Sequence, residues 1–244
     1  MNAPRLYVDD LADHLTQGHE VALSREHAKH VKALRMNDGQ QLVLFSGRGG
    51  HYQACLRWKD KSLPVAEISV FCRSISERHT QQTLAFSLCT PTKMALIIQK
   101  ATELGASHLV PLITQRATHG VSSLSESKIQ RYFRIIASAC EQCGVDTLPI
   151  FRSAMTLEDA VRMHKSHTCF MLDPLASVRL NASLCEHAEH IVWFVGPEGG
   201  WTEQEKACAD AEGIATVAMG QYVLRMETAC MATLVCGMAL SNAL

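Results

Sequence analysis

Apolar residues in the first 73 positions recur mainly at every second place, which is the period of a half-buried strand. The clearest such runs are Gln40–Phe45, His51–Trp58 and Pro64–Phe71, and a glycine-rich turn separates the first two. One helix is expected from about Ser24 to Met36, with Ser24 as its N-cap. Several short strands within so few residues predict a small β-barrel.

From residue 74 onward, strand-like runs alternate with helical patterns. Strands are expected at Thr83–Cys89, Ser107–Ile113, Thr168–Leu172, Ile191–Val195 and Ile214–Met219, with helices at Lys93–Leu104 and Ser125–Cys143 and others starting at Thr202 and at about Thr228. This alternation is typical of a parallel sheet covered by helices on both faces. We therefore predict an α/β protein with two domains, 1–73 and 74–244, joined in a polar stretch near residues 73–82.

The most informative segment begins where the strand Ile191–Val195 ends. Gly196-Pro197-Glu198-Gly199-Gly200 follows this strand, and Thr202 with Glu205 has the pattern of a capping box that starts a helix. Glycines at the carboxyl end of a parallel strand let the backbone approach a ligand closely. The segment lacks the usual nucleotide-binding glycine patterns, and its central acid disfavours a phosphate. It is either a ligand site or a tight turn in which Glu198 favours the helix N-terminus.

A second loop follows the strand at Ile214–Met219. Gly220 ends this strand, and Leu224-Arg225-Met226-Glu227-Thr228 leads into an apolar helix. Taken alone, this is a loop with a local ion pair and a threonine cap. Two such loops at neighbouring strand ends, however, form a cleft.

Composition narrows the class of protein. The chain has 244 residues, of which 47% are hydrophobic and 19% charged, as expected of a globular protein. It has no apolar run long enough to span a bilayer and no apolar stretch at its start, so we expect no membrane attachment and a cytoplasmic location. The ten cysteines lie scattered through apolar segments, as free thiols in a reducing compartment do. Cys140 with Cys143, and His27 with His30, lack further ligands nearby, so no metal is expected.

Charge gives only weak support for a nucleic-acid partner, because the net charge is −1. Residues 1–73 have ten Lys and Arg against eight Asp and Glu, or +2, while the rest have 13 against 16, or −3. Lys29, Lys32 and Arg35 lie three apart on the first expected helix. They form a charged face that is either only solvated or contacts phosphates.

Together, Gly196–Gly200 and Leu224–Ala229 resemble the signature of the RsmE family of small-subunit ribosomal RNA uracil-N3 methyltransferases, within the SPOUT superfamily. Five other segments match the family as well: Pro4–Tyr7, His30–Met36, Ile98–Gly105, Pro111–Arg116 and Ala139–Gly144. The resemblance thus covers nearly the whole chain. Departures are Val145-Asp146-Thr147 where the family usually has arginines, Ala95 where Glu is common and Met226 where Thr is common.

The resemblance implies a PUA-like RNA-binding β-barrel over residues 1–73 and a SPOUT methyltransferase domain with a C-terminal trefoil knot over residues 74–244. It implies S-adenosylmethionine as the cofactor, a homodimer, and 16S rRNA within the small ribosomal subunit as the substrate. The residues implied to bind the cofactor are Leu172, Gly196, Pro197, Glu198, Gly199, Gly200, Met219, Gly220, Leu224, Arg225, Met226 and Thr228.

In such a reaction the protein positions the base and stabilises negative charge on the uracil oxygens. Arg225, a permanent cation, is the expected catalytic residue. Arg5, Lys32, Arg35 and Arg116 are expected to contact RNA. The general base stays unassigned, because Glu198 suits a structural role equally well. Two alternatives stay open: a non-catalytic RNA-binding or ribosome-assembly protein, and an enzyme that uses another adenosyl or nucleotide cofactor.

Overall fold

The computed structural model describes residues 3–59, 63–74, 80–117, 124–186 and 188–240. The chain forms two compact units. The first comprises Met1–Ser76 with Ala137–Leu148, and the second comprises Glu77–Ile136 with Pro149–Leu244. Much of the predicted join near residues 73–82 lies outside the described residues.

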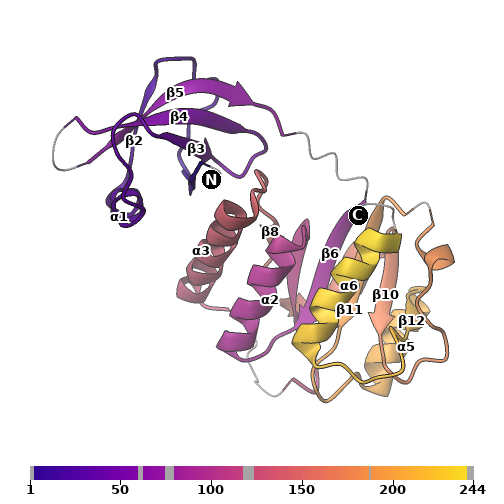
Figure 1. Ribbon diagram of the computed structural model, residues 1–244. Coiled ribbons are helices and arrows are strands. Elements are labelled where there is room, and N and C mark those ends of the chain that lie inside the picture. Colours follow the sequence, from indigo (N-terminus) through magenta and orange to yellow (C-terminus); the bar gives the residue numbers. More distant parts are fainter. Residues whose placement is uncertain (1–2, 60–62, 75–79, 118–123, 187, 241–244) are drawn as a thin grey trace. The chain divides into compact units, whose positions relative to one another are not determined.

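The N-terminal unit is built on a curled five-stranded sheet (Figure 1). Its strand order is β1 (Arg5–Tyr7), β3 (Gln41–Phe45), β4 (His51–Arg57), β5 (Val65–Cys72) and β2 (Glu20–Ala22). β1 and β3 are parallel and the other neighbours are antiparallel. The three strands predicted here are confirmed to within a residue or two. β1 and β2 were not predicted, because three residues are too few for an alternating pattern to show.

Helix α1 (Arg25–Ala33) starts where the sequence predicted and ends earlier than predicted. The side chain of Ser24 accepts a hydrogen bond from the N–H of His27, so the predicted N-cap is confirmed. The helix stops before the predicted Met36, because Arg35 takes a left-handed φ of 54°. Met36 itself is buried in the core of the unit.

The C-terminal unit contains a parallel sheet, which confirms the predicted α/β class. The order is β12 (Ala215–Val217), β10 (Thr168–Leu172), β11 (His190–Val195), β6 (Gln81–Ser87), β7 (His108–Ile113) and β8 (Ile150–Phe151), and β9 (Met155–Thr156) also pairs with β7. The helices of this unit are α2 (Pro91–Glu103), α4 (Leu157–His164), α5 (Glu203–Ala211) and α6 (Met226–Leu240), with a short 3-10 turn at Ala182–Leu184. Helix α3 (Glu126–Cys143) begins in this unit, and its residues from Ala137 onward belong to the first unit. The two-residue strands β8 and β9 and the short helix α4 were not predicted.

Helices cover both faces of this sheet. α6 packs on β6, β11 and α2, whereas α4 and α5 contact each other and reach β7 and β12. Figure 1 shows α2 and α6 in front of the sheet. The indole N–H of Trp193 donates to the Gln82 side chain at 2.9 Å, and the Gln82 amide donates to the Leu234 carbonyl at 3.1 Å. These two bonds join β11, β6 and α6 inside the core.

The register of the sheet aligns three strand ends. Leu172, the last residue of β10, pairs with Val195 of β11 and with Val217 of β12, each also the last residue of its strand. The loops that leave these strands therefore start side by side at one edge of the sheet. In open α/β sheets this carboxyl edge is where ligands bind.

Four histidines gather at the opposite, amino edge of the sheet. The His167 ring lies 4.2 Å from the His190 ring between centroids, and the His108 ring lies 5.7 Å from it. His164 is buried beside them. Burial, and then the neighbouring histidines, lowers the pKa of both His164 and His190 to about 4.

We expect the fold to lose stability between pH 7.5 and pH 5 because of this cluster. A histidine whose pKa is lower in the folded than in the unfolded chain stabilises the fold fully above the unfolded value, and this stability is lost as the pH falls below it. The free energy of unfolding should drop by about 2 kcal/mol for each of the two histidines at pH 5, measured by urea denaturation. His164→Leu, which cannot titrate, should show a smaller drop than the wild type. An equal drop in both proteins would contradict this assignment.

Candidate functional site

A pocket with a volume of about 630 Å³ opens at the carboxyl edge of the parallel sheet. It is lined by the loop after β10, by the glycine-rich loop after β11 and by the loop between β12 and α6. This volume suits a small organic ligand such as a cofactor. The two loops singled out in the sequence thus meet at one site.

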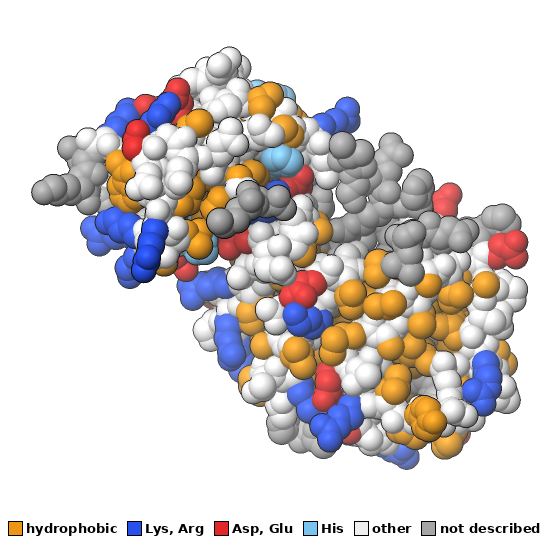
Figure 2. Space-filling model, in the orientation of Figure 1, with side chains coloured by type: hydrophobic (Ala, Val, Ile, Leu, Met, Phe, Trp, Pro, Cys, Tyr) orange, Lys and Arg blue, Asp and Glu red, His pale blue; other side chains and the backbone are white. Residues whose placement is uncertain are grey.

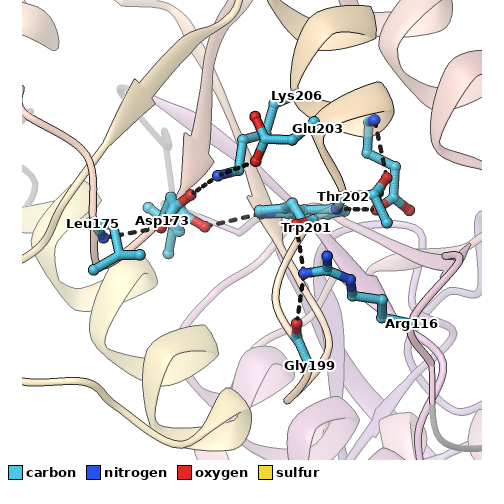
Figure 3. A network of polar contacts seen from close by, with 10 residues as sticks. Arg116, Asp173, Leu175, Gly199, Trp201, Thr202, Glu203 and Lys206 are labelled. Atoms are coloured by element: carbon cyan, nitrogen blue, oxygen red, sulfur yellow. Dashed lines mark hydrogen bonds and ion pairs between the residues drawn. The ribbon is translucent and has the colours of Figure 1, made fainter.

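Gly196 lets an aromatic ring form the floor of the glycine-rich loop. Trp201 is buried, and its indole N–H donates to the Leu172 carbonyl at 2.9 Å (Figure 3). A Cβ added to Gly196 would lie 2.8 Å from Cε2 of this indole, which is closer than real contacts allow. A glycine is therefore required where the loop leaves β11. Gly200, with a φ of 69°, takes the left-handed conformation that glycine favours.

Arg116 fixes the same loop from outside. One nitrogen of its guanidinium, Nη1, donates to the carbonyl oxygens of Gly199 and Trp201, both at 3.1 Å (Figure 3). A Cβ added to Gly199 would lie 3.1 Å from the Arg116 Cβ, so the two chain segments are in close contact. Arg116, which the sequence suggested for RNA contact, therefore lines the pocket and holds its glycine-rich loop.

The predicted capping box after this loop is confirmed. The Thr202 hydroxyl accepts from the N–H of Glu205 at 3.2 Å, and the Glu205 carboxylate accepts from the N–H of Thr202 at 2.8 Å. The other Glu205 oxygen accepts from the N–H of Gln115 at 3.0 Å. The loop is therefore anchored at its far end, and the start of α5 is capped by Thr202 and Glu205.

Glu198 instead pairs with Lys93, which is the third residue of α2. The same Lys93 ammonium lies 3.8 Å from the Glu227 carboxylate at the start of α6. The hydrogen bond to Glu198 raises the pKa of Lys93. Glu227 thus faces a lysine of another helix, in place of the local ion pair that the sequence allowed.

Arg225 lines the pocket and is exposed. No hydrogen bond or ion pair of its side chain is found within the described residues. It directly precedes α6, which starts at Met226, two residues before the predicted position. Its guanidinium is free to interact with a ligand in the pocket.

A further polar group lines the pocket that the sequence did not reveal. Asp173 follows β10, and its carboxylate accepts from the N–H of Leu175 at 2.9 Å and pairs with the Lys206 ammonium at 2.9 Å (Figure 3). Lys206 lies 3.3 Å from Glu203 as well. Burial alone would raise the pKa of Asp173, but Lys206 and the Leu175 N–H outweigh it and hold that pKa below its usual range. The one signal in the sequence was an acid at the end of a buried strand.

Apolar side chains surround the mouth of the pocket. Leu175 is 86% exposed, Tyr222 75% and Val223 78%. Figure 2 shows hydrophobic side chains gathered on the face of the C-terminal unit where α6 lies in Figure 1, and Val235 of α6 is among the exposed ones. Exposed apolar side chains that gather on one face are typical of an interaction surface.

The remaining predicted residues have the following places. The pocket is lined by Leu172, Gly196, Pro197, Glu198, Gly199, Gly200, Met219, Gly220, Leu224, Arg225 and Met226, whereas Thr228 does not line it. In the N-terminal unit, Lys32 and Arg35 are exposed, and the Lys32 ammonium lies 5.4 Å from the Trp58 ring.

Arg5, by contrast, forms an ion pair within the N-terminal unit. Its guanidinium pairs with the buried Asp146, whose other oxygen lies 2.9 Å from Nδ1 of His51. The Arg5 guanidinium also lies over the Phe45 ring. One of the positions where the family usually has arginine thus carries an acid that binds an arginine from β1.

The described residues contain no group of three or more His, Cys, Asp or Glu side chains arranged to hold a metal ion. None of their helices combines the length and the apolar character that crossing a bilayer requires.

The sequence and the fold of this chain are similar to those of RNA methyltransferases. Residues 76–237 match the family model Methyltrans_RNA, an RNA methyltransferase domain. Ribosomal RNA small subunit methyltransferase E of Synechocystis sp. is 30% identical over 205 residues, which are 81% of this chain and 65% of that protein. The protein of the same name from Rickettsia conorii is 27% identical, over 94% of this chain and 92% of its own length.

Two solved structures share the fold. Ribosomal RNA small subunit methyltransferase E from Neisseria gonorrhoeae, crystallised with bound S-adenosyl methionine, has a TM-score of 0.86 and 29% identity, and 98% of each chain is covered. A protein from Legionella pneumophila in complex with the same cofactor has a TM-score of 0.86 and 28% identity, and 98% of each chain is covered.

Proposed function

This chain belongs to the RNA methyltransferase domain family, and from that premise we propose that it methylates N3 of a specific uridine in 16S rRNA with S-adenosylmethionine. The resemblance to the RsmE family is confirmed by the relatives of that name. The observation that carries the proposal is the meeting of three strand-end loops, with their glycines and Arg225, at one pocket. A non-catalytic RNA-binding protein has no need of a glycine-lined pocket with a free cation.

The pocket fits the proposed cofactor in chemistry as well as in size. Gly196, Gly199 and Gly200 let the backbone approach a ligand closely. The pKa of Asp173 lies below its usual range, so its carboxylate is charged and attracts cationic groups such as an ammonium or a sulfonium. The residues proposed to hold S-adenosylmethionine are Leu172, Gly196, Pro197, Glu198, Gly199, Gly200, Met219, Gly220, Leu224, Arg225 and Met226, to which we add Asp173. Thr228 is left out, because it does not line the pocket.

The reaction forms a bond between the uracil N3 and the methyl carbon and breaks the bond between that carbon and sulfur. S-adenosylmethionine, when bound, supplies the methyl group. The N3 proton passes to solvent, since no residue is assigned as its acceptor, and the negative charge that develops on the base spreads onto the two flanking carbonyl oxygens. Arg225 stabilises this charge, because its planar guanidinium can donate to two acceptors. The target base must be unpaired to reach the pocket.

We assign RNA binding to a PUA-like N-terminal domain, residues 1–73, and catalysis to residues 74–244 with the SPOUT fold and a C-terminal trefoil knot. Lys32 and Arg35 support this division, because both are exposed cations of the N-terminal unit. The contacts of Arg5 and Arg116 within the chain favour structural roles for these two residues. The substrate is proposed to be rRNA of the small subunit, in the cytoplasm.

Cofactor binding can be measured without RNA. We expect saturable heat on titration with S-adenosylmethionine and with its demethylated product. A hundredfold excess over the dissociation constant should add about 2.7 kcal/mol to the free energy of unfolding and raise Tm. NAD and ATP should do neither. An absence of both heat and thermal shift with S-adenosylmethionine would exclude the methyltransferase assignment.

We further propose a homodimer that covers the apolar face of α6. Apart from Glu227, this helix carries no charged residue, and several of its apolar side chains are left partly exposed. A self-complementary interface would bury them. Light scattering should give twice the chain mass of 26.9 kDa, and Val235→Asp should shift the protein toward the monomer. A wild-type monomer across all concentrations would refute the proposal.

A further inference from the structure

One ammonium group bridges the two loops that form the pocket. Lys93 comes from the first turn of α2, Glu198 from the loop after β11, and Glu227 from the first turn of α6. The Lys93 ammonium hydrogen-bonds to the Glu198 carboxylate and lies 3.8 Å from Oε2 of Glu227. Lys93 does not itself line the pocket. The loop after β11 and the start of α6 are therefore linked through α2.

Lys93 supplies a positive charge beside the Glu227 carboxylate. Glu227 is mostly buried, with 15% of its side chain exposed, and its Oε2 has no hydrogen-bond partner. Lys93 is the cation recorded beside that oxygen within the described residues. The nearby thiols of Cys89 and Cys230 supply no charge, because burial raises the pKa of both and keeps them protonated. Without Lys93, the mostly buried Glu227 carboxylate would lose the cation that lies beside it.

We propose that Lys93 is a positioning residue that sets the distance between the two cofactor loops and, through Glu227, the place of Arg225. Arg225 precedes Glu227 by two residues, so a shift at the start of α6 moves the catalytic guanidinium. This inference rests on the proposed function, since it assigns Lys93 a part in forming the same site. Lys93 is given no contact with the reacting groups, because it does not line the pocket.

Replacement of Lys93 by Met should weaken S-adenosylmethionine binding about tenfold at pH 8 and slow methyl transfer. Lys93→Met combined with Glu227→Gln should recover most of the affinity at pH 8, since it removes the buried charge that Lys93 faces. Lys93→Arg should behave as the wild type does. Lys100→Met is the matched control, because Lys100 of the same helix pairs only with Glu103, at 2.8 Å, among the recorded ion pairs.

The thermal midpoint of the cofactor-free protein gives a readout that does not depend on activity. Lys93→Met should lower Tm, and the double variant should restore it. A loss of affinity and of Tm that Glu227→Gln does not rescue would overturn the proposal, and so would a Lys93→Met variant that loses neither. If the wild type bound no S-adenosylmethionine, the proposed function would fail, whereas the Tm pattern would still decide whether Lys93 holds the loops.

Discussion

Arg225→Ala is expected to slow methyl transfer by about 10²–10³-fold while the affinity for S-adenosylmethionine changes little. The reason is that Arg225 is exposed at the pocket with no partner found among the described residues, so its cation is available for charge that develops on the uracil oxygens. Removal of one such donor costs about 2.7–4 kcal/mol of transition-state stabilisation in other enzymes. Arg225→Lys should recover only part of the rate, since an ammonium cannot span two acceptors.

Single-turnover rates at saturating cofactor separate this role from a structural one. If Arg225 only shaped the loop before α6, its replacement would weaken cofactor binding as much as it slows transfer. The contact of Glu227 with Lys93, in place of Arg225, argues against that alternative. Near wild-type transfer by Arg225→Ala under saturating cofactor would remove Arg225 from the catalytic role.

Gly196→Ala is expected to weaken cofactor binding and to slow turnover together, by about ten- to a hundredfold. The added Cβ would lie 2.8 Å from the indole of Trp201, which is buried and cannot move aside freely. Overpacking of this kind costs about 1–3 kcal/mol. The ring must shift, so its hydrogen bond to the Leu172 carbonyl is lost and the loop around it moves.

The matched rescue variant is Gly196→Ala combined with Trp201→Phe. The smaller ring makes room for the new methyl group, so the double variant should bind S-adenosylmethionine better than Gly196→Ala alone. Calorimetric titration of the three variants and the wild type measures the coupling directly. An unchanged dissociation constant for Gly196→Ala would show that the loop does not depend on the packing of this ring.

Local features of the fold were predictable because their causes lie close together in the sequence. The buried strands are apolar runs, and the caps at Ser24 and Thr202 need only residues within three positions. The strand order was not predictable, because β12, β10, β11 and β6 become neighbours in an order unrelated to their order in the chain. The very short strands carry too few residues for a period to be recognised.

The candidate site, too, was predictable only where its features lie close together in the sequence. Glycines after Val195 and an arginine before α6 indicated two loops, and sequence alone could not place Lys93 or Arg116 beside them. Lys93 lies 105 positions from Glu198, and Arg116 lies 83 positions from Gly199. Such contacts depend on which strands pair and in which register. The pairing of Arg5 with Asp146, 141 positions apart, is a further contact of this kind.

The most direct test of the central proposal is mass analysis of nucleosides from 16S rRNA after incubation with the purified protein. The RNA should come from small subunits of cells that lack this protein, and the methyl group of S-adenosylmethionine should carry an isotopic label. We expect labelled N3-methyluridine at a single position, formed by the wild type and nearly absent with Arg225→Ala. A label on another atom or another base, or no label at all while S-adenosylmethionine binds, would contradict the assignment as a uracil-N3 methyltransferase of the small ribosomal subunit.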